Sequence, residues 1–106
     1  MELSTAQRQY LRGLAHPLNP VVRVGLGGLS NEVVAKTSAE LESHELIKVK
    51  FQDGFTDPLK EAVESLAGQT GAAVVQVIGR VGVLYRRRKK DATIVLPKVK
   101  VKRDEG

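Results

Sequence analysis

Val21-Val22-Arg23-Val24-Gly25-Leu26-Gly27-Gly28-Leu29-Ser30-Asn31-Glu32, residues 21–32, joins a short apolar run, a glycine loop and the start of a helix. The run is β-branched and ends at Gly25, which predicts a short buried strand. Three glycines in four positions allow positive φ angles and the close approach of another backbone. Ser30 or Asn31 can cap the helix that follows. Free N–H groups and the positive end of the helix dipole would then face outward, which favours an anion.

Three glycine loops of known function have a similar composition. The dinucleotide pattern G-x-G-x-x-G is incomplete, because Ser30 replaces its last glycine and no acidic residue ends a second strand about 20 residues later. The P-loop pattern fails, because Leu29 stands where its lysine is needed. The third pattern, G-x-x-G from Gly25 to Gly28, is the loop with which KH-type proteins clamp an RNA backbone. From the loop alone, a plain structural turn is an equally good interpretation.

Length and composition limit the possible classes of protein. A chain of 106 residues, 42% hydrophobic and 27% charged, is expected to form one soluble globular domain. No apolar run approaches the roughly 20 residues of a membrane span, and the N-terminus has no basic-then-apolar signal segment. A cytoplasmic location without a membrane partner is therefore expected. The absence of cysteine excludes disulfides and thiolate metal sites.

The net charge of +5 is concentrated toward the C-terminal end. Residues 1–79 hold 7 Lys/Arg and 9 Asp/Glu, whereas residues 80–106 hold 10 and 3. Such a basic block is the usual electrostatic footprint of a nucleic-acid binder, although basic tails also bind anionic membranes and acidic proteins. Its densest part is Arg86-Arg87-Arg88-Lys89-Lys90, for which the alternative interpretation is a solvated strand edge that discourages edge-to-edge pairing.

Capping residues and apolar spacing predict three helices and four strands. A capping box of Ser4 and Gln7 opens the first helix, whose Leu11, Leu14 and Ala15 are expected to face the core. The expected helices run from about 5 to 15, from about 31 to 43, and from Asp57-Pro58, with the proline at the first helical position, to a stop between 68 and 71. The expected strands are 21–24, 46–51, 73–78 and 81–86.

The order α-β-α-β-α-β-β predicts a two-layer α/β domain with a four-stranded mixed sheet. The last two strands read as a hairpin around Gly79-Arg80, so the last strand should be antiparallel to its neighbour. In the strand 46–51, the period of two puts Lys48 and Lys50 on the face opposite to the buried apolar side chains.

Several segments, in the right order, resemble the CRM domain family (chloroplast RNA splicing and ribosome maturation) in its stand-alone, YhbY-like form. They are residues 3–5, 14–22, 25–29, 45–50, 75–79 and 84–86, so the resemblance covers roughly residues 3–97. It implies a fold similar to the C-terminal domain of translation initiation factor three. It also implies RNA binding, with precursors of the large ribosomal subunit as the target. Leu26 departs from the polar or basic residue that often follows the first glycine in this family.

Catalytic and metal-binding patterns do not emerge from the sequence. His16 and His44 have no partner at a metal-ligand spacing, and no serine lies in a nucleophile elbow. Tyr10, Tyr85 and two phenylalanines are too few for a base-stacking platform. RNA contacts should therefore be dominated by phosphate and shape. DNA binding is less favoured, because no helix carries a cluster of base-reading side chains.

We therefore predict a monomeric, non-enzymatic RNA-binding protein without cofactor, metal or small-molecule substrate, acting on ribosomal RNA in assembling large subunits. The domain is expected at residues 1–97 and a flexible basic tail at 98–106. The alternative is a protein-interaction adaptor whose basic tail engages an acidic partner. The candidate RNA-binding residues are Gly25, Leu26, Gly27, Gly28, Ser30, Arg8, Arg12, Lys36, Lys48, Lys50, Arg80, Arg86, Arg87, Arg88, Lys89 and Lys90.

Overall fold

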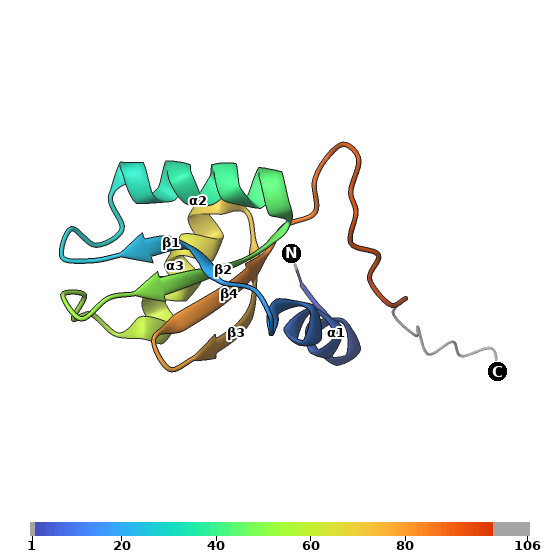
Figure 1. Cartoon of the computed structure of the whole chain (residues 1–106), viewed down its shortest axis with the longest axis horizontal. Helices are drawn as coiled ribbons and strands as arrows, with labels where there is room; N and C mark the ends of the chain where they lie inside the picture. Colours follow the sequence, from blue (N-terminus) through green and yellow to red (C-terminus); the bar gives the residue numbers. More distant parts are fainter. Residues whose placement is uncertain (1, 99–106) are drawn as a thin grey trace.

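A computed structural model describes residues 2–98, and its elements follow the predicted order (Figure 1). The helices are α1 (Thr5–Ala15), α2 (Asn31–His44) and α3 (Leu59–Thr70). The strands are β1 (Pro20–Val24), β2 (Leu46–Phe51), β3 (Ala73–Ile78) and β4 (Val81–Tyr85). They form one four-stranded mixed sheet, which confirms the predicted α/β fold class. The predicted basic tail lies, apart from Lys98, outside the described residues.

The strand order in the sheet is β1-β2-β4-β3. β1 is parallel to β2, and β4 is antiparallel to both β2 and β3. The arginine run therefore follows a central strand, because the β3–β4 hairpin returns β4 to the space beside β2. The interpretation of this run as the continuation of an exposed sheet edge is thus wrong.

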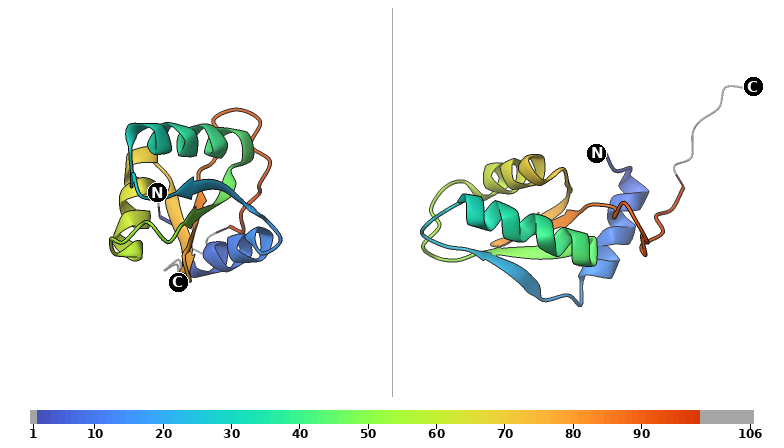
Figure 2. Two further views of the ribbon diagram at one scale, coloured as in Figure 1. Left: turned by 60° about the vertical axis from the view of Figure 1, so that its left-hand side comes forward. Right: turned by 90° about the horizontal axis from the view of Figure 1, so that it is seen from above.

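The two faces of the sheet are covered unequally (Figure 2). On one face, α2 and α3 pack against the strands along their length, and the apolar side chains of β1, β2 and β4 meet Leu41, Val63 and Leu66 there. On the other face, α1 covers one end only, where Leu11 and Ala15 join a smaller core. The remainder of that face, toward the C-terminal ends of β1 and β2, is not covered by a helix, and Arg23 and Lys50 are exposed there.

The helix ends follow the sequence signals with one shift. Both hydrogen bonds of the Ser4–Gln7 capping box are present. α3 begins one residue later than predicted, because Pro58 has an extended ψ of 125° and is itself the N-cap, without a side-chain capping bond. At the other end, Gly71 closes α3 with a φ of +70°, the left-handed conformation that glycine adopts most easily. Within residues 2–98 no helix has the length and apolarity needed to cross a membrane.

Candidate nucleic-acid interface

The glycine loop is a tight turn between β1 and α2, at the left end of the domain in Figure 1. Gly28 N donates to Gly25 O at 3.0 Å, and Gly28 has a φ of +65°. Leu26, near the tip, is 89% exposed. A Cβ placed on Gly27 would meet nothing within 4 Å, so the outer surface of the loop is accessible to another molecule.

The loop after β2 supports the glycine loop from one side. Gln52 N donates to Val24 O at 2.8 Å, which ties the two loops together at their base. A Cβ on Gly54 would lie 3.3 Å from Leu26 N, so the two backbones are in close contact. This packing against a neighbouring loop holds the glycine turn in place.

Arg80, one of the predicted RNA-binding residues, binds and stabilises the loop after β2. Its guanidinium donates to the carbonyl oxygens of Phe51, Gln52 and Phe55 at 2.9, 2.8 and 2.7 Å. These bonds connect the β3–β4 turn to the segment that follows β2. Arg80 therefore contributes first to the shape of this end of the domain, and most of its donors are directed into the protein.

The N-terminus of α2 lies directly behind the glycine loop. Ser30 is the N-cap, and its Oγ accepts a hydrogen bond from Val33 N at 3.2 Å. The amides of Asn31 and Glu32 belong to the first turn, where no intrahelical acceptor exists for them. These amides and the helix dipole favour an anion, whereas the Glu32 carboxylate in the same turn opposes one.

A groove runs between β1 and α2 from this helix end. Its volume is about 470 Å³, and Arg23 and Ser30 line it together with Glu32 and Lys36. Lys36 is also within 3.1 Å of Glu40, one turn further along the helix. The charge of this groove is thus mixed, because the Glu32 carboxylate lies beside the Lys36 ammonium group.

The open face of the sheet carries a basic row. Arg23 and Lys50 are Cα partners on the parallel strands β1 and β2, so they lie about 4.8 Å apart across the sheet. Their chain neighbours are buried in the core on the opposite face, which directs both cations outward. Lys48 follows on the same face and donates to His16 O at 3.2 Å. Among the described residues neither Arg23 nor Lys50 has an ion-pair partner.

Arg23 was not among the residues predicted from the sequence. The pattern that could have identified it is the alternation Val22-Arg23-Val24, because a period of two in a half-buried strand turns the middle side chain to the open face.

The side chain of Arg86, the first arginine of the basic run, makes its hydrogen bonds within the protein. Arg86 donates to Ser38 Oγ, Ser38 O and Thr70 O at 3.0, 2.9 and 2.8 Å, and pairs with Glu42 at 3.3 Å. Its side chain is 21% exposed. Arg86 thereby joins the second half of α2 to the last turn of α3.

The remaining predicted cations lie away from the glycine loop. Arg87, Lys89 and Lys90 are exposed and follow β4 at the opposite end of α2 (Figure 1). α2 has 14 residues, so it separates the two ends by about 20 Å. On α1, Arg8 Nε lies 3.4 Å from Val74 O and Arg12 is exposed. The structure therefore divides the predicted residues between two ends of the domain.

Glu45 is a buried polar residue that the sequence analysis missed. It is the C-cap of α2, has a φ of 65° and has no exposed surface. Its carboxylate accepts hydrogen bonds from Arg88 N, from Thr93 N and Oγ1, and from Ile94 N, at 2.8 to 3.0 Å. Burial alone would raise the pKa of this carboxyl, but these hydrogen bonds outweigh it and lower the pKa from 4.5 to about 2.

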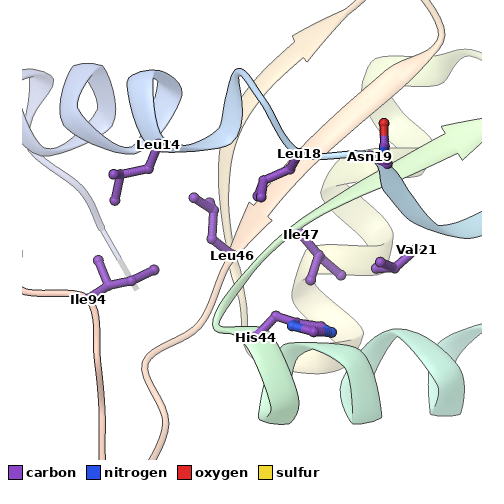
Figure 3. Close-up of a pocket in the computed structure, with 8 residues that line it drawn as sticks. All are labelled: Leu14, Leu18, Asn19, Val21, His44, Leu46, Ile47 and Ile94. Carbon is purple, nitrogen blue, oxygen red and sulfur yellow. The ribbon is translucent and has the colours of Figure 1, made fainter.

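A separate apolar cleft of about 390 Å³ lies between α1 and the end of α2 (Figure 3). Leu14, Leu18 and Ile94 line it with Leu46, while His44 and Asn19 stand at its polar positions. Leu14 was predicted to face the core, but it is 38% exposed. The reason is that α1 rests on one end of the sheet and buries only its Leu11 and Ala15 side.

The acidic and histidine side chains offer no metal site. In the stretch from residue 2 to residue 98, no three His, Asp or Glu residues gather closely enough to hold an ion. His44 Nε2 instead lies 3.3 Å from Glu40 Oε1 on the surface of α2.

Residues 3–86 match the CRS1 / YhbY (CRM) domain. An RNA-binding protein of Haemophilus influenzae is 45% identical over 96 residues, which cover 91% of this chain and 96% of that protein. Probable RNA-binding protein YqeI of Bacillus subtilis is 34% identical over 95 residues, or 90% and 99% of the two chains. The solution structure of a candidate RNA-binding protein of Staphylococcus aureus superposes with a TM-score of 0.78 at 38% identity, covering 91% of this chain and all of that one.

Proposed function

We propose that this chain, which belongs to the CRS1 / YhbY (CRM) domain family, binds RNA at the glycine-loop end of the domain. The observation that carries the proposal is the pair Arg23 and Lys50 on the open sheet face beside the bare loop. Like charges on neighbouring strands repel and are destabilising, and the described residues supply no counter-charge for them. A polyanion that lies across this face relieves that repulsion.

The loop and the basic row would contact the backbone of the RNA. Amides around Gly27 and at the start of α2 are donors for phosphate oxygens, and the Arg23 and Lys50 side chains supply charge next to them. Base stacking has little support, because Phe51, Phe55 and Tyr85 are buried in the cores, and the one exposed aromatic side chain among the described residues, Tyr10, lies on α1. Binding therefore depends on phosphate and shape, with modest preference among sequences.

The target that fits best is ribosomal RNA in precursors of the large subunit, where the protein serves as an assembly factor. The basis for this target is the resemblance of the chain to the YhbY-like form of the family. The role is one of binding, without catalysis or cofactor, and it is exerted in the cytoplasm where ribosomes assemble.

Single charge-neutralising variants test the interface. Arg23→Gln and Lys50→Gln should each reduce the slope of log K against log salt by about 0.7 to 0.9, the value for one phosphate contact. Lys60→Gln removes the same charge from an exposed position on α3, near the β3 side, and should leave the slope unchanged. Fluorescence anisotropy with a labelled fragment of large-subunit ribosomal RNA provides the measurement. Equal effects of all three variants would contradict a localised interface.

A protein-interaction adaptor is the second candidate function, and the apolar cleft beside Leu14, Leu18 and Ile94 is the observation that favours it. The two functions differ in their response to nuclease. A protein bound through RNA should leave sedimenting ribosomal particles when the RNA is digested, whereas an adaptor held by a protein partner should stay with that partner. Apart from Lys98, the basic tail of this second candidate lies beyond the described residues.

A further inference from the structure

Glu45 holds the basic loop, residues 87–93, by its backbone. The carboxylate binds Arg88 N at the start of the loop and Thr93 N and Ile94 N at its end. It thus closes the loop into a ring around one buried acidic side chain. Burying a carboxylate is costly unless its oxygens are hydrogen-bonded, and here the loop itself provides the donors.

The bonds to Glu45 leave the charged groups of Arg87, Lys89 and Lys90 exposed, whereas Arg88 Nε is buried and has no hydrogen-bond partner among the described residues. Within residues 2–98, none of Arg87, Arg88, Lys89 and Lys90 forms an ion pair, with Glu45 or with any other acid. Had Glu45 bound a guanidinium or ammonium group, it would have neutralised part of the basic run. By binding amides and a hydroxyl instead, it fixes the path of the chain without removing charge from it.

The segments on both sides of the loop are anchored as well. Before the loop, Arg86 N donates to Glu45 O at 2.9 Å, and the Arg86 side chain is bound between α2 and α3. After the loop, Ile94 and Leu96 pack on the core under α1, and Pro97 O accepts a bond from Gln7 at 3.0 Å. The loop is therefore presented from a fixed base.

We propose that Glu45 is a positioning residue, which fixes the loop so that Arg87, Lys89 and Lys90 form a second contact with RNA phosphates. This contact lies at the end of α2 opposite to the glycine loop, so one RNA is engaged at two points separated by the length of the helix. The inference rests on the proposed RNA-binding function and extends it to a residue that is buried and does not itself touch RNA.

Charge and position predict opposite results for Glu45→Gln. Removing a negative charge next to a basic run should strengthen RNA binding if only electrostatic attraction matters. If Glu45 positions the loop, the same change should weaken binding, because each loop cation must then be ordered when RNA binds, at a cost of about two- to tenfold in affinity per side chain. Glu42→Gln is the matched control, since Glu42 is an exposed acid next to Arg86 and its loss changes the charge equally.

The experiment compares both variants with the wild-type protein by anisotropy, using a labelled hairpin of large-subunit ribosomal RNA over a series of salt concentrations. For Glu45→Gln we expect at least a fivefold loss of affinity and a salt slope smaller by about 1 to 2, which corresponds to about two phosphate contacts. Trypsin should also cleave the variant faster at the loop. Glu42→Gln should bind as the wild type does, or more tightly.

Glu45→Gln binding with wild-type affinity and slope, or more tightly, would overturn the inference. If the wild-type protein itself fails to bind the hairpin, the proposed function fails instead, and the two failures are thus distinguishable. Should Glu45→Gln not fold, Thr93→Val removes only the hydroxyl that donates to Glu45. That variant should show a smaller loss of affinity and a smaller decrease in salt slope than Glu45→Gln. An unchanged affinity and slope would then count against the positioning role.

Discussion

Arg86 and Arg87 are adjacent in the basic run, yet the structure predicts a large loss of stability when Arg86 is replaced and almost none when Arg87 is replaced. Arg86→Ala removes three hydrogen bonds of 2.8 to 3.0 Å to Ser38 and Thr70. A hydrogen bond from a charged donor contributes about 1.5 to 3 kcal/mol. Because water can reach part of the vacated site, we expect a total loss of about 2 to 4 kcal/mol rather than the sum. Arg87 is exposed and makes no bond of this kind among the described residues, so Arg87→Ala should change stability by less than about 0.5 kcal/mol.

Urea denaturation followed by circular dichroism measures this difference directly. For a domain of this size the loss at Arg86 corresponds to a fall in Tm of roughly 10 to 25 °C, with an unchanged m-value. Arg86→Lys should have a stability between those of the wild type and Arg86→Ala. Lysine keeps the charge, but its single ammonium group cannot bind several acceptors at once as the planar guanidinium does. An Arg86→Ala variant as stable as the wild type, or an equally destabilised Arg87→Ala variant, would refute the assignment of Arg86 to the interior.

The other predictions concern Glu45, the glycine loop and the packing under β4. The pKa of Glu45 is lowered to about 2, so its contribution is present above pH 4.5 and is lost as the pH falls from 4.5 toward 2. Glu45→Gln should flatten this part of the stability–pH curve in urea titrations. Leu26→Asp with Gly27→Asp should weaken RNA binding in a filter assay and keep a normal fold, because Gly27 has open space and no positive φ. Gly82→Ala should lower stability by about 1 to 3 kcal/mol in urea denaturation, since its Cβ would lie 2.7 Å from Val63 Cγ2.

Local signals in the sequence were sufficient to predict the helices and strands and their order along the chain. The capping box at Ser4, the strand that alternates around Lys48 and the hairpin turn at Gly79 each predicted their element correctly. These features depend on residues close together in the chain. The position of β4 between β2 and β3 depends instead on pairing between distant segments. Because of this position, the arginine run follows a central strand of the sheet rather than an edge strand.

The candidate site was harder to predict, because the use of a cation depends on the acceptors that the fold brings to it. Arg80 and Arg86 look like surface cations in the sequence, but carbonyl oxygens from other elements surround them. Glu45 has its donors more than forty residues later in the chain, so no local pattern could reveal its burial. Arg23, by contrast, could have been recognised from its place between two valines.

The central claim, that RNA is bound at the glycine loop and the open basic face of the sheet, is tested most directly by an NMR titration. Amide resonances of the ¹⁵N-labelled protein are followed while a hairpin of large-subunit ribosomal RNA is added. We predict the largest changes at residues 23–32 and 48–54, with a second group at 87–90, and small changes along α3. Changes confined to the cleft around Leu14 and Leu18, or no changes at saturating RNA, would contradict the account.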